Sequence, residues 1–171
     1  MATVERAIEI ARFHHRDQKD KAGNDYIAHP LYVMERFALD DVVCRIVGVL
    51  HDVPEDTEMT VDDLRREGFS EEIIEALDAI TIRPCETLDD YIQRVKKNAI
   101  ATRVKIEDVR HNLIRSIEAA RDASQDKEQR EMYGRMAKRY IKTFKFLLEP
   151  FDERSSYGQE ALDAERVCQT L

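Results

Sequence analysis

The chain has 171 residues and a mass of 20.0 kDa, enough for one domain with a buried core. Hydrophobic residues make up 43% and charged residues 36%, a composition typical of packed amphipathic helices and not of a disordered chain. The net charge of −8 argues against binding along a nucleic-acid backbone, and three widely spaced cysteines do not fit a disulfide framework. No apolar run approaches the roughly 20 residues that span a bilayer. We therefore expect a cytoplasmic protein without nucleic-acid or membrane partners.

The first part of the chain predicts helices separated by polar loops. Apolar residues at positions i, i+3, i+4 and i+7 of residues 4–11 predict an amphipathic first helix. A polar loop containing Gly23 follows, and a second helix is expected near residues 29–37. Residues 40–52 are apolar nearly all round after two leading aspartates, which predicts a central buried helix with acids at its positive end. Pro54 is expected to stop or kink this helix.

Capping patterns predict further helices. Thr60, Ser70 and Thr87 each stand where an N-terminal cap precedes a helix. Another helix is expected over residues 100–122. Its predicted inward face comprises Ile106, Val109, Leu113 and Ile117.

The C-terminal part predicts a long helix through residues 133–149, followed by a linker and a short helix. The predicted inward residues of the long helix are Met136, Tyr140, Phe144 and Leu147. No alternating strand pattern or internal repeat is present. We expect an all-α fold, a single helical bundle over residues 1–150, with residues 151–171 as a linker and helix packed on the same domain.

Chemistry-bearing side chains gather in "LHDVPEDTEMT", residues 50–60, directly after the apolar helix. This segment holds His51, Asp52, Glu55 and Asp56. A lone His-Asp pair is more often a hydrogen-bonded surface pair than a metal site, so the interpretation depends on partners elsewhere in the chain.

His29 and Asp108 are the candidate partners. Two imidazoles and two carboxylates suit a divalent transition metal such as manganese, iron or zinc. Asp108 shares a helix face with Lys105 and Asn112. This face lies opposite the apolar positions, so an ordinary solvated surface is the alternative for Asp108. If the four groups converge in a buried place, a metal is favoured, because burying them without one is costly.

Three segments, taken in order, resemble the HD-domain phosphohydrolases, specifically the RelA/SpoT-type alarmone hydrolases. They are "GNDYIAHP", "LHDVPEDT" and "VKIEDVRHNL". The resemblance extends from about residue 3 to residue 150, and its nearest form is the short hydrolase without synthetase or regulatory domains. It implies an all-α HD domain that removes the 3′-pyrophosphate from (p)ppGpp.

The resemblance also implies roles for individual residues. His29, His51, Asp52 and Asp108 match the metal ligands, with Mn²⁺ as the expected ion. Glu55 and Asp56 match the acidic pair that handles the attacking water. Such a pair takes a proton from water whose pKa the metal lowers. The implied substrate-binding residues are Lys21, Asn112 and Tyr140.

The chain departs from the family pattern in the polar loop and after the His-Asp pair. Asp20 stands where a second basic residue is usual, Asp25 replaces a proline, and Pro54 lies inside the acidic segment. The lost cation weakens the case for a highly charged alarmone more than the case for hydrolysis. A phosphatase of another nucleotide, a non-catalytic nucleotide-binding regulatory module and a metal-free helical scaffold are therefore the alternatives. The sequence does not fix the oligomeric state.

Overall fold

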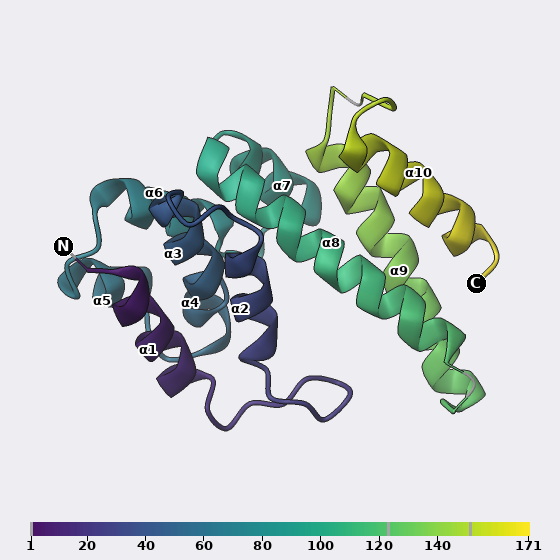
Figure 1. The fold of residues 1–171 in the computed structure, drawn as a ribbon, viewed down its shortest axis with the longest axis horizontal. Helices are drawn as coiled ribbons and strands as arrows, with labels where there is room; N and C mark the ends of the chain where they lie inside the picture. The colour runs from purple at the N-terminus through teal and green to yellow at the C-terminus, as the bar shows by residue number, and fades with distance from the viewer. Residues whose placement is uncertain (1, 123, 151) are drawn as a thin grey trace. The chain divides into compact units, whose positions relative to one another are not determined.

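The computed structural model of the protein describes residues 2–122, 124–150 and 152–171. These residues form helices, with a single antiparallel β-bridge between Lys19 and Asp25 as their only extended pairing (Figure 1). The prediction of an all-α fold is confirmed. Within the described part of the chain, no helix combines the length and apolar character that a membrane span requires.

The helices divide between two compact units, Met1–Lys105 and Ile106–Leu171. The first unit contains α1 (Val4–His14), α2 (Ala28–Glu35), α3 (Val42–Leu50), α4 (Val53–Asp56), α5 (Val61–Arg66), α6 (Glu71–Ile80), α7 (Leu88–Lys96) and the start of α8 (Ala99–Arg121). The second contains the rest of α8, α9 (Lys127–Leu147) and α10 (Ser156–Gln169). The domain boundary at residue 150 stays a prediction.

Helix α3 is the centre of the first unit, as its apolar sequence predicts. It packs against α1, α2 and α6. The carboxylate of Asp41 caps its first turn by accepting a hydrogen bond from the Cys44 N–H. A Cβ atom at Gly48 would lie 3.2 Å from the backbone of Met34 in α2, so glycine lets these two helices approach closely. The close approach matters because α2 and the end of α3 carry the candidate metal-binding histidines.

Pro54 does not disrupt the acidic segment. Helix α3 ends at Leu50, and a separate short helix, α4, begins at Val53 with the proline in its first turn. Proline is tolerated there because the first N–H groups of a helix have no intrahelical acceptor. The sequence anticipated the interruption but not the new helix, which carries both Glu55 and Asp56.

In the second unit, α9 packs against α10. Phe144 and Leu147 are buried as predicted, but Met136 and Tyr140 are only half-buried. The buried positions one residue further along are Ala137 and Ile141. The predicted inward face is therefore displaced by one position in the first half of this stretch and correct in the second half.

Candidate metal and hydrolytic site

His51 lies at the junction between α3 and α4, where it is buried with 2% of its surface exposed. Its Nδ1 lies 2.8 Å from the carbonyl oxygen of Gly48. A carbonyl can only accept, so Nδ1 carries the hydrogen and Nε2 of the neutral ring carries the lone pair. Nε2 lies 3.1 Å from Oδ1 of Asp52. The Nε2 lone pair and the Asp52 oxygen repel each other at this distance, so a proton or a metal cation bound by both atoms is favoured.

His29 approaches the same place from the first turn of α2. Its ring centroid is 5.3 Å from that of His51, and its Nε2 is 3.6 Å from Oδ2 of Asp52. The imidazole is 5% exposed. The Asp52 carboxylate therefore has one oxygen near each histidine, and both histidines are held by buried helices.

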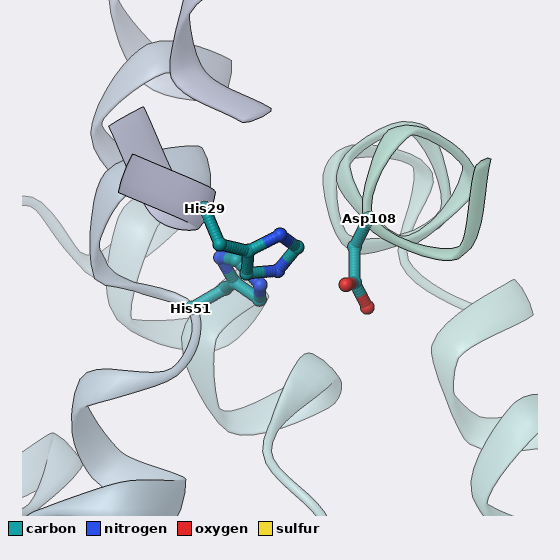
Figure 2. Close-up of side chains that lie close together, drawn as sticks. All are labelled: His29, His51 and Asp108. Atoms are coloured by element: carbon teal, nitrogen blue, oxygen red, sulfur yellow. The ribbon is translucent and has the colours of Figure 1, made fainter. Parts of the chain in front are cut away.

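Asp108 completes a three-residue group. Each of His29, His51 and Asp108 offers one ligand atom, and these atoms lie within 4.8 Å of one another (Figure 2). Asp108 is 4% exposed, so the solvated helix face considered from the sequence is wrong for this residue. The donor set of two imidazoles and a carboxylate fits a divalent transition metal. The described residues thus contain a candidate His/Asp metal site, with Asp52 adjacent as the predicted fourth ligand.

The two predicted water-activating acids lie together on α4, and both are exposed. Oε2 of Glu55 accepts a hydrogen bond from the Ile82 N–H at 3.4 Å. The surrounding protein removes enough water from this carboxylate to raise the pKa of Glu55, while the positive charge of Lys105 opposes the increase. Glu55 is therefore a better proton acceptor than an ordinary surface glutamate.

Asp56 is held by a residue that the sequence interpretation did not single out. The hydroxyl of Tyr26 lies 3.0 Å from Oδ2 of Asp56 and 2.8 Å from Oδ2 of Asp52. Burial, followed by the negative charge of Asp52, raises the pKa of Tyr26, so the phenol keeps its hydrogen. The available signal was its position three residues before His29 in "GNDYIAHP".

The predicted substrate-binding residues differ in their surroundings. Lys21 is exposed on the loop between α1 and α2. Asn112 donates a 2.6 Å hydrogen bond to Oδ1 of Asp108. Tyr140 is half-buried on α9, with the Arg139 guanidinium 5.2 Å from its ring centroid. Their roles as nucleotide contacts stay predictions.

The departures from the family pattern have structural explanations. Oδ1 of Asp20 accepts hydrogen bonds from the backbone N–H groups of Ala22 and Asn24, each at 2.9 Å. Asp25 pairs with Lys19 at 2.5 Å. Both aspartates therefore stabilise the turn that presents Lys21.

Known proteins with similar sequences carry two different enzyme names. A GTP pyrophosphokinase of Streptomyces coelicolor is 30% identical over 161 residues, covering 85% of this chain and 19% of that protein. A guanosine-3′,5′-bis(diphosphate) 3′-pyrophosphohydrolase of Borreliella burgdorferi is 38% identical over 82 residues, covering 46% of this chain and 12% of that protein. The chain thus spans less than a fifth of the length of either relative. No protein-family model matches it.

Among solved structures, a metazoan ortholog of SpoT that hydrolyzes ppGpp has a similar fold. The TM-score is 0.68, with 21% identity over 100% of this chain and 98% of that one. The resemblance to the RelA/SpoT-type HD hydrolases is confirmed. The similarity of the two folds agrees with the all-α architecture of this chain.

Proposed function

We propose that this chain is a metal-dependent hydrolase that removes the 3′-pyrophosphate from (p)ppGpp or a related nucleotide. The observation that carries the proposal is the approach of His29, His51 and Asp108 to one another, beside the acid-bearing helix α4. We propose Asp52 as the fourth ligand and Mn²⁺ as the ion. The similar proteins named for 3′-pyrophosphohydrolase activity support this choice of reaction.

The reaction is a hydrolysis in which a water oxygen bonds to the phosphorus attached to the ribose 3′-oxygen. The bond between that phosphorus and the 3′-oxygen breaks, pyrophosphate leaves, and the 3′-oxygen takes a proton. A bound divalent metal supplies Lewis-acid activation of water and neutralises charge on the phosphate oxygens.

The chain's own residues position and deprotonate the water in this proposal. Glu55 and Asp56 are the proton acceptors on α4, and the raised pKa of Glu55 suits it to this task. Lys21 contributes positive charge to nucleotide binding, and Tyr140 is proposed to line the nucleotide pocket. Asn112 contributes through its hydrogen bond to Asp108.

Some of the similar proteins are named GTP pyrophosphokinases and others 3′-pyrophosphohydrolases. We favour hydrolysis because the gathered side chains are histidines and carboxylates, which bind a metal and activate water. A small-molecule nucleotide as the ligand is part of the same proposal. The cytoplasmic location and the absence of nucleic-acid and membrane partners stay predictions.

The test is to incubate Mn²⁺-loaded protein with ppGpp, pppGpp and a panel of other nucleotides. Pyrophosphate release from ppGpp, lost in Asp52→Ala and kept in Asp62→Ala, is the expected result. Asp62 is an apt control because it is an exposed acid paired with Arg65 on α5. Orthophosphate release from other nucleotides alone would support a different phosphatase. Nucleotide binding without turnover would support a regulatory module, and a protein that binds no Mn²⁺ would overturn the metal-dependent proposal.

A further inference from the structure

The hydroxyl of Tyr26 lies within hydrogen-bond distance of two acids that have different roles in the proposed reaction. It lies 2.8 Å from Asp52, the proposed ligand, and 3.0 Å from Asp56, a proposed proton acceptor. Among the described residues, this hydroxyl is the only side-chain group that hydrogen-bonds the Asp56 carboxylate. Asp52, in contrast, also faces both histidines. Loss of the phenolic oxygen would therefore affect Asp56 more than Asp52.

The backbone of Asp56 is held from the same loop. The side-chain amide of Gln18 donates a 2.8 Å hydrogen bond to the carbonyl oxygen of Asp56. The amide oxygen of Gln18 faces Nδ1 of His15 at 2.7 Å, so the imidazole donates and fixes the orientation of the amide. The Tyr26 N–H donates to the carbonyl oxygen of Gln18 at 3.1 Å. The loop between α1 and α2 thus holds Asp56 through its main chain and its carboxylate.

These contacts restrict the side-chain conformation of Asp56. Asp56 is exposed, and an exposed carboxylate samples several rotamers unless a partner restrains it. Small displacements of a catalytic group lower the rate strongly. A phenol has one hydrogen, so Tyr26 donates to one carboxylate at a time. An Asp56 that has taken a proton from water can donate it to the phenolic oxygen while Tyr26 donates to Asp52.

We propose that Tyr26 is a positioning residue that fixes the Asp56 carboxylate relative to the proposed ligand Asp52. Gln18, oriented by His15, supports the same carboxylate through the main chain. The inference rests on the proposed hydrolysis and adds to it a group that acts through Asp56 rather than on the nucleotide.

The test compares Tyr26→Phe with the wild type in pyrophosphate release from ppGpp. The variant keeps the ring and removes only the hydroxyl. We expect kcat to fall about 10- to 100-fold, as for other residues that orient a catalytic group. We expect KM and the dissociation constant of Mn²⁺ to change less than about threefold, because Asp52 keeps its contacts with the histidines. Tyr91→Phe is the matched control, since the buried Tyr91 hydroxyl donates to the carbonyl oxygen of Ile80. It should lower thermal stability without lowering kcat.

A double variant of Tyr26 and Asp56 tests whether Tyr26 acts through Asp56 or only stabilises the fold. Adding Tyr26→Phe to Asp56→Asn should lower kcat by less than about threefold further, because the carboxylate to be positioned is already gone. Two independent losses that multiply would overturn the positioning role, as would an unchanged kcat in Tyr26→Phe beside an active wild type. A wild type that releases no pyrophosphate would overturn the proposed function itself, and the positioning role with it.

Discussion

Asn112 donates a 2.6 Å hydrogen bond to Oδ1 of Asp108 one turn earlier on α8. The sequence resemblance assigned Asn112 to the nucleotide and Asp108 to the metal. The hydrogen bond links the two assignments, because an amide that orients a ligand carboxylate affects metal binding before any nucleotide arrives.

We therefore predict that Asn112→Ala weakens Mn²⁺ binding about tenfold in the absence of nucleotide. Isothermal titration calorimetry with the metal alone measures this. Asn98→Ala is the control, since Asn98 accepts a hydrogen bond from the Ala101 N–H at the start of α8 and has no contact with Asp108. If Asn112→Ala raises KM for ppGpp and leaves Mn²⁺ affinity unchanged, the residue serves only the nucleotide.

The charge of Lys105 should set the acid limb of the pH–rate profile. Partial loss of water around the carboxyl group raises the pKa of Glu55 above its ordinary value of 4.5, and the charge of Lys105 opposes the increase. Glu55 accepts a proton only when it is ionised, so activity should rise as pH increases through its raised pKa. Removing the positive charge in Lys105→Met would raise that pKa further.

The prediction is that Lys105→Met moves the acid limb of kcat/KM to higher pH at fixed Mn²⁺ concentration. Lys97→Met, at an exposed position just after α7, should leave the limb in place. A limb that stays fixed in Lys105→Met, or moves equally in both variants, would show that Glu55 does not control it.

Protonation of Glu55 should have opposite effects on stability and activity: it stabilises the fold but removes the proton acceptor. A carboxyl group whose pKa is raised by folding stabilises the fold when it is protonated, and that contribution is lost as pH rises from 4.5 through the raised value. Metal-free Glu55→Gln should therefore lose less stability than the wild type over this interval. Urea unfolding at a series of pH values measures the difference.

The central helix was predictable because its sequence leaves few alternatives. An apolar segment preceded by aspartates gives a buried, capped helix, and the structure places α3 there with Asp41 as its cap. The His-Asp pair at its end followed from the same segment. Ser70 occupies the N-cap position of α6, although its side chain makes no capping hydrogen bond.

Other features depend on contacts that a linear pattern does not encode. The burial of Asp108 depends on what packs against α8, and helical periodicity alone assigned it to a solvated face. The bridge from Tyr26 to Asp56 joins residues 30 positions apart, so no local spacing predicts it. On α9, Met136 is followed directly by Ala137 and Tyr140 by Ile141, so periodicity alone left the buried face ambiguous by one position.

Lys21 should contribute to nucleotide affinity rather than to the chemical step. It is exposed on a turn that Asp20 stabilises through hydrogen bonds to backbone N–H groups. Lys21→Ala should raise KM for ppGpp about 5- to 10-fold with a smaller change in kcat, because the lost charge attracts ground state and transition state alike. Lys19→Ala is the comparison, since Lys19 is paired with Asp25 and should contribute less to binding. A KM in Lys21→Ala equal to that of the wild type would remove Lys21 from the binding site.

The cap of α3 should be a measurable source of stability for the helix that carries His51. One oxygen of Asp41 accepts from the Cys44 N–H at 3.2 Å, and the other accepts from the Arg103 guanidinium at 2.6 Å. Asp41→Ala removes both interactions and should lower the free energy of unfolding by about 1–2 kcal/mol. Asp41→Asn keeps a capping oxygen and loses the charge that pairs with Arg103, so it should cost less than about 1 kcal/mol. Urea denaturation of metal-free protein measures both changes. If Asp41→Asn lowers the free energy of unfolding by more than half as much as Asp41→Ala does, the ion pair with Arg103, rather than the cap, stabilises this end of the helix.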